Sequence, residues 1–415
     1  MSENLCSQLK RYLSQEILSI LQDAGTQASE VGQKLFLVGG VVRDLFLGRP
    51  NFDLDVVVEG DAIELAQKLA HPRQVKAIVH HRFGTAKLYF ADFSLDIATA
   101  RRETYSCPGA LPDVQPGSIT DDLFRRDFSI NAMALCLAPE QFGELIDLYR
   151  GEADIKDRVI RILHPNSFID DATRVFRAIR YEQRLNFALE THTAELLQKA
   201  LSLIETVSRD RIRHELMLMV MEEYPERALK RAGELGVLRE LHPSLRGDGW
   251  IGERFKQARQ LDKPGSLAVL YLCLLVYHFT PGENEQVMVR FNFPKKLAEA
   301  TQKTLQIKAK LEHLAKPELK PSTIYRLLHG FVPQAIYANM LASESDVVRQ
   351  RLHWYLAKLR YVKPLLTGDD LKKLGVPSGP SFGDVLHTLH EARLNGDVRT
   401  RQDEEKLVRR WLNNL

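Results

Sequence analysis

Two aspartates, Asp53 and Asp55, stand one residue apart in the apolar stretch FDLDVVVEG. In a strand, residues two apart point to the same face, so the two carboxylates should project together while Phe52, Leu54 and Val56 face the core. Adjacent carboxylates repel each other, and one pKa rises unless a cation lies between them. Their hard oxygen atoms suit Mg²⁺. The pair therefore indicates a divalent-metal site, with a solvated turn as the alternative for an isolated D-x-D.

A third carboxylate and a glycine turn are expected beside this pair. Asp96 lies in FSLDIATA, which reads as a neighbouring strand, and Gly39 and Gly40 separate the apolar run KLFLV from the helix-spaced segment VVRDLFLG. Glycines let backbone N–H groups approach a ligand, and the helix that follows favours an anion such as a triphosphate. Arg43, one turn into that helix, should add a charge-assisted contact to the phosphates.

The elements that must position these residues form a small sheet. Between residues 34 and 99 the runs KLFLVGG, FDLDVVV, AIVHHRFGTAKLYF and FSLDIATA read as strands, and DAIELAQKLA reads as an amphipathic helix. Residues 4–24 have the apolar spacing of one helix, and the pattern after Tyr149 is helical to the end, with breaks at prolines and glycines. We therefore predict an α+β fold, in which a small mixed-sheet head precedes a long all-helical body.

Composition excludes several classes of protein. The chain of 415 residues has 57 basic and 54 acidic residues and a net charge of +3, so any nucleic-acid site must be a local patch. Its four cysteines form no C-x-x-C pair, which argues against a zinc site or a disulfide framework and fits a reducing cytoplasm. The longest apolar run, Leu267 to Phe279, is shorter than the roughly 20 residues that span a bilayer. Because the N-terminus also lacks signal-peptide features, we predict a cytoplasmic protein that does not contact membranes.

At this spacing the glycine turn and the D-x-D resemble the signature of the DNA polymerase β nucleotidyltransferase superfamily. Three further stretches look like those of the class II CCA-adding enzyme and bacterial poly(A) polymerase family: LFRRDFSINAMAL at 123–135, DDATRVFRAIRYEQRLNF at 170–187 and SRDRIRHELMLMV at 208–220. The segment from Leu366 to Val398 is similar to the C-terminal part of bacterial members, whereas the resemblance is weak in the helical segment before it.

This resemblance implies roles for individual residues. Asp53 and Asp55 would hold catalytic Mg²⁺ ions, with Asp96 as a third catalytic carboxylate. The nucleotide would be bound by the glycine turn and by charged residues of the quoted motifs, namely Gly39, Gly40, Arg43, Arg126, Asp171, Arg174, Arg177 and Arg180. Position 170 departs from the family pattern, because many relatives have Glu where this chain has Asp170. The carboxylate of an aspartate lies closer to the backbone than that of a glutamate, so this difference bears on nucleotide selectivity.

The chemistry of Asp171 and Arg174 also suggests a role without the resemblance. They are three residues apart, hence neighbours on one face of a predicted helix, where an exposed ion pair would have little effect. Placed against a base, the carboxylate accepts from an exocyclic amine while the guanidinium donates to a ring nitrogen. Cytosine and adenine offer this arrangement, whereas uracil and guanine reverse both roles. Arg177 and Arg180 continue the same helix, either toward the ligand or as a solvated basic face.

The resemblance further implies an elongated molecule in three parts: a nucleotidyltransferase head at 1–148, a nucleotide-selecting helical neck at 149–240, and a helical body and tail at 241–415 that bind tRNA. We expect a metal-dependent enzyme that adds C and A to the tRNA 3′ end from CTP and ATP without a nucleic-acid template. A poly(A) polymerase of the same family and a non-catalytic RNA-binding protein on the same fold are the alternatives. The sequence leaves open full CCA, CC-only or A-only addition, and the oligomeric state.

Residues 101–124 form a Pro- and Gly-rich stretch, RRETYSCPGALPDVQPGSITDDLF, which reads as a long loop. Its composition suggests a semi-rigid lever with hinges. In the resembling family a flexible loop here assists the switch from CTP to ATP, and relatives that add only CC have this loop reduced. The length of the stretch therefore predicts an enzyme that can add the terminal A.

Overall fold

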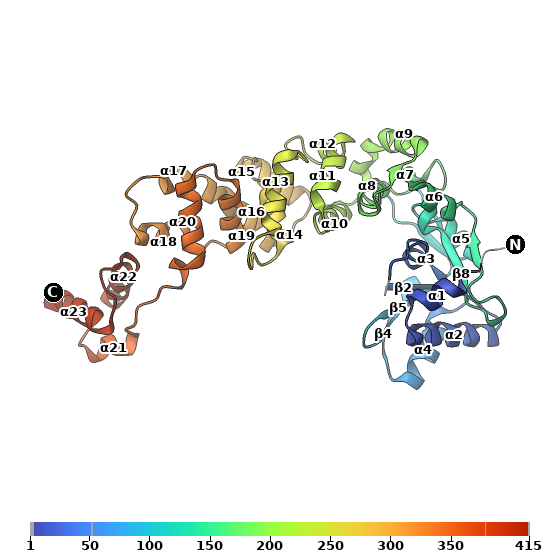
Figure 1. Ribbon diagram of the computed structural model, residues 1–415, viewed down its shortest axis with the longest axis horizontal. Coiled ribbons are helices and arrows are strands. Elements are labelled where there is room, and N and C mark those ends of the chain that lie inside the picture. Colours follow the sequence, from blue (N-terminus) through green and yellow to red (C-terminus); the bar gives the residue numbers. More distant parts are fainter. Residues whose placement is uncertain (1–3, 51–52, 378, 414–415) are drawn as a thin grey trace. The chain divides into compact units, whose positions relative to one another are not determined.

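The structure, a computed structural model, describes residues 4–50, 53–377 and 379–413. The chain divides into two units: unit 1 is Met1–Leu216 with Leu235–Glu240, and unit 2 is Met217–Glu234 with Leu241–Leu415. The strands belong to unit 1, while the described part of unit 2 consists of helices and turns (Figure 1). The predicted α+β class, with a mixed-sheet head and a helical remainder, is confirmed.

A seven-stranded mixed sheet forms the centre of unit 1. Its strands are β1 Lys34–Val38, β2 Asp53–Glu59, β3 Lys76–His80, β4 Thr85–Tyr89, β5 Ser94–Thr99, β8 Met133–Cys136 and β9 Leu145–Asp147. They lie in the order β3-β4-β5-β2-β1-β8-β9. β2 and β5 run parallel, whereas the other neighbouring strands are antiparallel. The long run AIVHHRFGTAKLYF is a hairpin of β3 and β4, joined through a short 3₁₀ turn at His81–Phe83.

The helices of unit 1 begin with a departure from prediction, because residues 4–24 form two helices instead of one. Ser14 interrupts the chain in an extended conformation, and its side chain caps the second helix by accepting from the Ile17 backbone N–H. The helices are α1 Cys6–Tyr12, α2 Gln15–Glu30, α3 Gly40–Phe46, α4 Ala62–Arg73, α5 Ile119–Phe124, α6 Gly151–Asp157, α7 Ser167–Asp170, α8 Arg174–Leu185, α9 Thr191–Lys199, α10 Arg209–Val220 and α12 Val237–Leu241. Two further strands pair as a parallel bridge, β10 Val159–Ile160 and β11 Ala188–Leu189.

The two faces of the sheet explain why a buried strand carries aspartates. In β2, Leu54 and Val56 are 0% and 1% exposed and face the core, as predicted. Phe52, expected on the same face, lies outside the described residues. Val57 points to the opposite face, where it packs in an apolar cluster with α5. Asp55 shares that second face and lines the cavity described below.

The stretch at 101–124, predicted as a loop, is largely ordered secondary structure. β6 Arg101–Thr104 and β7 Asp113–Pro116 form an antiparallel ribbon, and the capped helix α5 follows. The ribbon tip, residues 105–112, and the two residues between β7 and α5 are without regular structure. At the tip, Gly109 has a φ of +79° and packs so closely on Thr206 that a Cβ would lie 2.4 Å from the Thr206 carbonyl oxygen. The tip is therefore anchored on its own unit.

Unit 2 is built from helix pairs around a core that includes Ile336 and Leu352. Its helices are α11 Pro225–Glu234, α13 Gly249–Arg259, α14 Leu267–Leu275, α15 Pro281–Arg290, α16 Lys295–Lys308, α17 Leu311–Leu314, α18 Pro321–Leu328, α19 Pro333–Ala342, α20 Asp346–Ala357, α21 Gly368–Lys373, α22 Pro380–Asn395 and α23 Arg401–Asn413. The apolar run at 267–279 is a buried helix, as predicted. Among the described residues, no helix is long and apolar enough to cross a membrane.

Candidate active site

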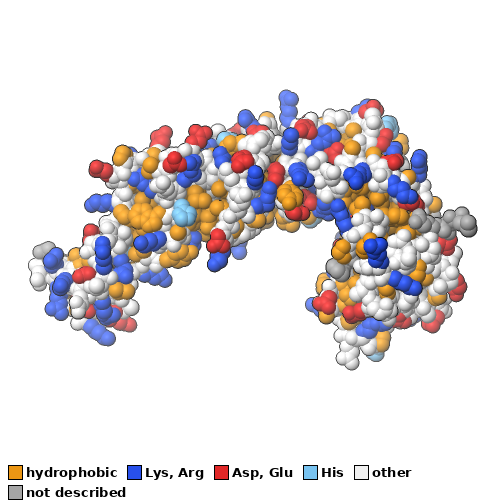
Figure 2. Space-filling view, viewed as in Figure 1, with side chains coloured by type: hydrophobic (Ala, Val, Ile, Leu, Met, Phe, Trp, Pro, Cys, Tyr) orange, Lys and Arg blue, Asp and Glu red, His pale blue; other side chains and the backbone are white. Residues whose placement is uncertain are grey.

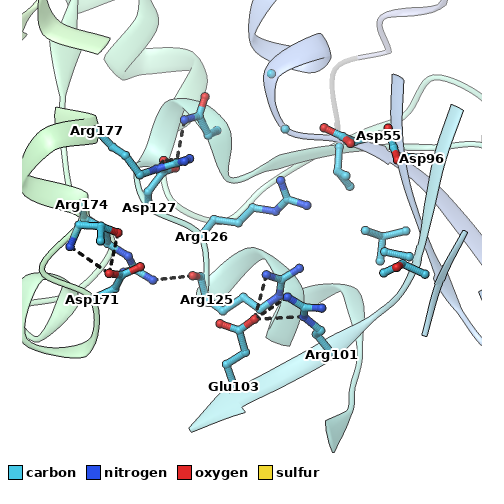
Figure 3. Close-up of a pocket in the computed structure, with 18 of the residues that line it drawn as sticks. Asp55, Asp96, Arg101, Glu103, Arg125, Arg126, Asp127, Asp171, Arg174 and Arg177 are labelled. Atoms are coloured by element: carbon cyan, nitrogen blue, oxygen red, sulfur yellow. Dashed lines mark hydrogen bonds and ion pairs between the residues drawn. The ribbon is translucent and has the colours of Figure 1, made fainter. Parts of the chain in front are cut away.

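A cavity of about 830 Å³ in unit 1 gathers most of the predicted site residues. Its volume lies in the range of small-molecule sites. Figure 3 shows Asp55 and Asp96 on one side of it, Arg126 reaching toward them, and the residues around Arg174 on the other side. The predicted residues that line it are Gly39, Gly40, Asp55, Asp96, Arg126, Asp171, Arg174 and Arg177. Asp53, Arg43 and Arg180 are not among its described lining residues.

The carboxylates come from two parallel strands held in register. Asp55 of β2 lies directly opposite Asp96 of β5, as the sequence predicted for a neighbouring strand. Asp96 accepts a hydrogen bond from the Lys87 ammonium of β4 at 2.6 Å. Asp53, at the exposed start of β2, lies on the same face as Asp55. Burial, followed by the charges of Asp53 and Asp96, raises the pKa of Asp55 to about 6.

This donor set fits a divalent cation that shares its coordination with a substrate. Two side chains, Asp53 and Asp55, place hard carboxylate oxygens on one face of β2. No group of three or more His, Cys, Asp or Glu residues arranged to hold a metal occurs among residues 4–50, 53–377 and 379–413. A complete protein cage is therefore absent from the described part of the chain. Mg²⁺ is commonly bound by one or two carboxylates plus substrate phosphates, which matches this arrangement.

The glycine turn brings an arginine next to the carboxylates. Gly39 precedes α3 with φ +77° and ψ −135°, a conformation that side chains with a Cβ rarely adopt. A Cβ at this position would lie 2.8 Å from Arg126 Nη1 and 3.9 Å from Asp55 Oδ2. Glycine is therefore required here both for the backbone conformation and for the space that the Arg126 guanidinium occupies.

Replacing Gly39 with alanine should both destabilise unit 1 and displace Arg126. The strained backbone costs about 1–3 kcal/mol of unfolding free energy, and the added methyl group enlarges the distance between Arg126 and Asp55. We expect a lower thermal midpoint and a KM for the nucleotide raised roughly tenfold, a change of about 1.4 kcal/mol. Gly282→Ala is the matched control, because a Cβ there meets nothing within 4 Å and its φ is not positive. Equal effects of the two substitutions would contradict this role for the turn.

Arg126 is held at the cavity by a buried carboxylate. Asp122 of α5 is 0% exposed and accepts from Arg126 Nε and Nη2 at 3.2 and 2.9 Å. The other oxygen of Asp122 accepts from Arg125 at 2.9 and 2.6 Å. Because one carboxylate holds both guanidinium groups, Arg126 keeps its free Nη1 directed toward the carboxylates of the sheet (Figure 3).

Arg43 was predicted to contact phosphate, but it is buried behind the cavity wall. It is 6% exposed, pairs with the adjacent Asp44, and donates from Nη1 to Asn131 Oδ1 at 2.7 Å. Asn131 in turn donates to Asp127 at 3.0 Å. Arg177 donates from Nε to the other oxygen of Asp127 at 2.8 Å. Although burial opposes ionisation, Arg177 and the other hydrogen-bond donors hold the pKa of Asp127 below its ordinary value. Arg43 thus supports a network that orients Arg177.

Asp171 does not lie on the same helix as Arg174, contrary to the predicted pattern. α7 ends at Asp170, Asp171 is extended, and α8 begins at Arg174. The Asp171 carboxylate is fixed through one oxygen, Oδ1, which accepts from Thr173 N, Thr173 Oγ1 and Arg211 Nη2 at 2.9, 2.7 and 2.7 Å. No described residue donates to Oδ2, so this oxygen is available to an exocyclic amine.

Some N–H groups of the Arg174 guanidinium donate to protein acceptors, and the others remain available to a ligand. It is 4% exposed, and it donates from Nη1 to Ser167 Oγ at 3.1 Å and from Nη2 to the Arg125 carbonyl oxygen at 2.7 Å. A guanidinium has five N–H donors, so further donors remain for a ligand in the cavity. The break between α7 and α8 therefore places an acceptor and a donor side by side at the cavity, without a direct ion pair between them.

Arg180, the last arginine predicted to contact nucleotide, is not among the described lining residues of the cavity, although its partner Glu215 is. It donates to Glu215 of α10 at 3.4 Å. This contact joins α8 to α10 at the cavity wall.

Several residues that shape the cavity were not assigned from the sequence. Asp127 and Asn131 lie in the quoted RRDFSIN stretch, and Arg211 lies in the quoted SRDRIRHE stretch. Asp127 and Asn131 are polar positions next to Phe128 and Ile130, which was a weak signal, whereas Arg211 lies among other charged residues and had none. The hydrogen-bond partners of these residues depend on how separate helices pack. Arg211, for example, donates to Asp171, which is 40 residues away in the sequence.

Two protein families match this chain. Residues 35–161 match the Poly A polymerase head domain. Residues 186–247 match the family described as probable RNA and SrmB-binding site of polymerase A. The first match contains the glycine turn, all three carboxylates and Arg126.

Curated relatives carry related names. The chain is 36% identical to an A-adding tRNA nucleotidyltransferase of Geobacter sulfurreducens, over 96% of this chain and 48% of that protein. It is 34% identical to an A-adding tRNA nucleotidyltransferase of Halalkalibacterium halodurans, over 99% of this chain and 96% of that protein. The chain thus spans about half the length of the first relative and nearly all of the second.

Solved structures match over the whole chain. A CCA-adding enzyme in an apo form has a TM-score of 0.85 at 30% identity, covering 100% of this chain and 99% of that chain. The Thermotoga maritima CCA-adding enzyme complexed with tRNA has a TM-score of 0.78 at 30% identity, covering 99% of each chain.

Proposed function

The chain belongs to the class II CCA-adding tRNA nucleotidyltransferase family, and on this premise we propose that it adds the terminal adenosine to the 3′ end of tRNA. The chemistry of this family implies a divalent metal cation, and Mg²⁺ is the cation in our proposal. The supporting observation is the single cavity in which Asp55, Asp96 and the glycine turn face Asp171 and Arg174. The A-adding names of the two relatives favour adenosine as the product.

In the proposed reaction, the tRNA 3′ hydroxyl attacks the α-phosphate of ATP, a phosphodiester bond forms, and pyrophosphate leaves. The cation, held by Asp53 and Asp55, would supply positive charge at the attacking and leaving oxygens. Arg126 would donate to the triphosphate from the position that Asp122 fixes. Arg177, oriented by Asp127, would add a second cationic contact.

Nucleotide choice is proposed to rest on Asp171 and Arg174. Asp171 Oδ2 would accept from the N6 amine of adenine, and Arg174 would donate to N1. Because Arg211 and Thr173 already occupy Oδ1, the carboxylate is fixed before the nucleotide arrives. Guanine would place an oxygen and a ring N–H against this pair, leaving buried polar groups unsatisfied.

An extension assay tests the proposal directly. The full chain is incubated with Mg²⁺, ATP or CTP, and tRNAs that end before CCA, after C or after CC. We expect one adenosine on the tRNA that ends in CC. Failure to extend this tRNA, or extension of any RNA into a long poly(A) tract, would contradict the proposal.

A second candidate function is addition of all three nucleotides. It is favoured by the likeness to CCA-adding enzymes over the whole chain, and by the fact that cytosine offers the same amine and ring nitrogen as adenine. The same assay separates the candidates, because only the second predicts incorporation from CTP on the tRNA that ends before CCA.

Shortening the ribbon tip should suppress adenosine addition. Thr104 and Asp113 face each other in register, so residues 105–112 can be replaced by an Asn-Gly turn that keeps the ribbon paired. This change removes Tyr105 from the cavity wall and the contact of Gly109 with Thr206. We expect kcat for A addition to fall roughly tenfold or more. Ala110→Ser, which keeps the length of the tip, is the control. Unchanged A addition by the shortened variant would show that the tip has no part in the reaction.

The predicted division into head at 1–148, neck at 149–240, and body and tail at 241–415 is retained as a proposal, with tRNA contacts assigned to the last part. Action in the cytoplasm is likewise proposed, from the cysteine usage noted above.

A further inference from the structure

Charged side chains lie in a row across the sheet of unit 1, and one of them, Lys87, has no part in the proposed reaction. Lys87 of β4 lies opposite Asp96 of β5, and Asp96 lies opposite Asp55 of β2. Residues directly opposite on neighbouring strands share a face of the sheet. Arg126 reaches the other end of the row, beside Asp55. The row therefore has a cation at each end and two carboxylates between them.

The alternation of β4 places Lys87 on the face of the carboxylates. Its neighbours Ala86 and Leu88 are buried in the core, so the Lys87 side chain extends to the opposite face. Its ammonium donates to Asp96 Oδ2 at 2.6 Å. Because the strands follow the order β4-β5-β2, Lys87 contacts Asp96 from the side opposite to Asp55. Lys87 is not among the described residues that line the cavity.

This contact affects how many carboxylates a cation can use. Asp53, Asp55 and Asp96 share one face of the sheet. Within the part of the chain that the structure describes, no three acidic, His or Cys side chains are nevertheless arranged to hold a metal ion. The Lys87 ammonium occupies Asp96 Oδ2, and a divalent cation would have to compete with it for that oxygen. Since the affinity of a site for a hard cation depends on the number of charged ligands, Lys87 weakens the site.

Lys87 also acts on the carboxylate at the centre of the site. Burial and then the charge of Asp53 raise the pKa of Asp55, whereas the charges of Arg126 and Lys87 lower it. The positive charge of Lys87 therefore extends to Asp55, although Asp96 lies between them. The same charge repels a divalent cation that approaches Asp55.

The pair of Lys87 and Asp96 differs from the ordinary ion pairs of the protein surface. Basic and acidic side chains are interspersed over the visible surface (Figure 2), and exposed pairs have little effect. The side chains of Lys87 and Asp96 are only 31% and 36% exposed. Asp96 lines the cavity beside Asp55, so the charge that pairs with it influences what binds there.

We propose that Lys87 is a positioning residue that holds Asp96 away from the cation before nucleotide binds, so that Asp53 and Asp55 bind the cation weakly until the nucleotide phosphates join them. The inference rests on the proposed function, because it concerns the cation site of that reaction. Phosphate oxygens are the further ligands that Mg²⁺ commonly takes beside one or two carboxylates. Their negative charge also offsets the repulsion by Lys87.

The test measures binding of Mn²⁺ to the full chain without nucleotide or tRNA, from the electron paramagnetic resonance signal of free Mn²⁺. In Lys87→Met a positive charge is lost and the third carboxylate is released, so we expect Kd for Mn²⁺ to fall about tenfold. In the double variant Lys87→Met/Asp96→Asn the released carboxylate is absent, and Kd should return to within about threefold of the wild-type value.

Lys76→Met is the matched control. Lys76 of β3 is exposed, and its ammonium lies 5.9 Å from the centroid of the Tyr89 ring, as that of Lys87 does. It forms no ion pair within residues 4–50, 53–377 and 379–413. The control therefore loses a charge from the same face without releasing a carboxylate, and its Kd for Mn²⁺ should equal that of the wild type.

An unchanged Kd for Mn²⁺ in Lys87→Met would overturn the proposal, as would a tenfold gain that persists in the double variant or occurs equally in Lys76→Met. A raised KM for ATP in Lys87→Met with unchanged Mn²⁺ affinity would identify Lys87 as a phosphate contact and equally overturn it. Should Lys87→Met fail to fold, as judged by thermal unfolding, Lys87→Gln replaces it. A wild-type protein that adds no adenosine would defeat the proposed function, whereas the Mn²⁺ measurement needs no reaction and decides this inference separately.

Discussion

Asp55→Asn is expected to abolish nucleotide incorporation while leaving the fold intact. The amide has the shape of the carboxylate but cannot supply a charged oxygen to a divalent cation, so the transition state loses its main source of positive charge. We expect kcat to fall at least about 10³-fold, which corresponds to about 4 kcal/mol. Asp53→Asn should act in the same direction, because its carboxylate lies on the same face of β2.

Stability should not fall with this substitution. Burial beside Asp53 and Asp96 disfavours the ionised form of Asp55, as its raised pKa of about 6 indicates. A neutral amide removes this repulsion, so the thermal midpoint of Asp55→Asn at neutral pH and without metal should equal or exceed that of the wild type. Asp92→Asn, an exposed aspartate in the turn before β5, is the matched control. A near-normal rate with Mg²⁺ in Asp55→Asn would show that the metal assignment is wrong.

Changing the base-contacting pair should alter which nucleotide is used. Arg174→Ala removes a buried donor that the Ser167 hydroxyl and the Arg125 carbonyl hold in place. We expect kcat/KM for ATP to fall about 10²- to 10³-fold, since a site built to hydrogen-bond a substrate loses several kcal/mol when the partner is missing. Single-nucleotide incorporation from ATP, CTP, GTP and UTP measures the effect.

Asp171→Asn should instead admit the wrong bases. An amide can present an N–H to the carbonyl oxygen of guanine or uracil, which a carboxylate cannot. Because Arg211 and Thr173 fix the other side of the group, the substitution should leave its position nearly unchanged. The ratio of GTP to ATP incorporation should rise, whereas Arg209→Ala, an exposed arginine at the start of α10, should leave it unaltered. If both Asp171→Asn and Arg174→Ala discriminate among the four nucleotides as the wild type does, the two residues do not contact the base and have only a structural role.

The carboxylates and the glycine turn were predictable because their signal is local. Alternation within β2 determines that Asp53 and Asp55 share a face, and the turn between β1 and α3 needs glycine within a few residues. The strand that carries Asp96 was also predictable from its local pattern, and it was expected to neighbour β2. Its parallel direction and the register that places Asp96 opposite Asp55 were decided by the tertiary structure.

Longer-range features were not predicted. Helix periodicity does not show where a helix is interrupted, and it does not show which residues a side chain will contact. The spacing of Asp171 and Arg174 is that of one helix, yet the turn between α7 and α8 is stabilised by Thr173 and by Arg211, a residue 40 positions away. Arg43 has the spacing of a ligand contact, but Asp44 and Asn131 bind its guanidinium in the interior. Such choices between water, ligand and protein partners depend on which side chains meet after the chain has packed, and no local pattern contains that information.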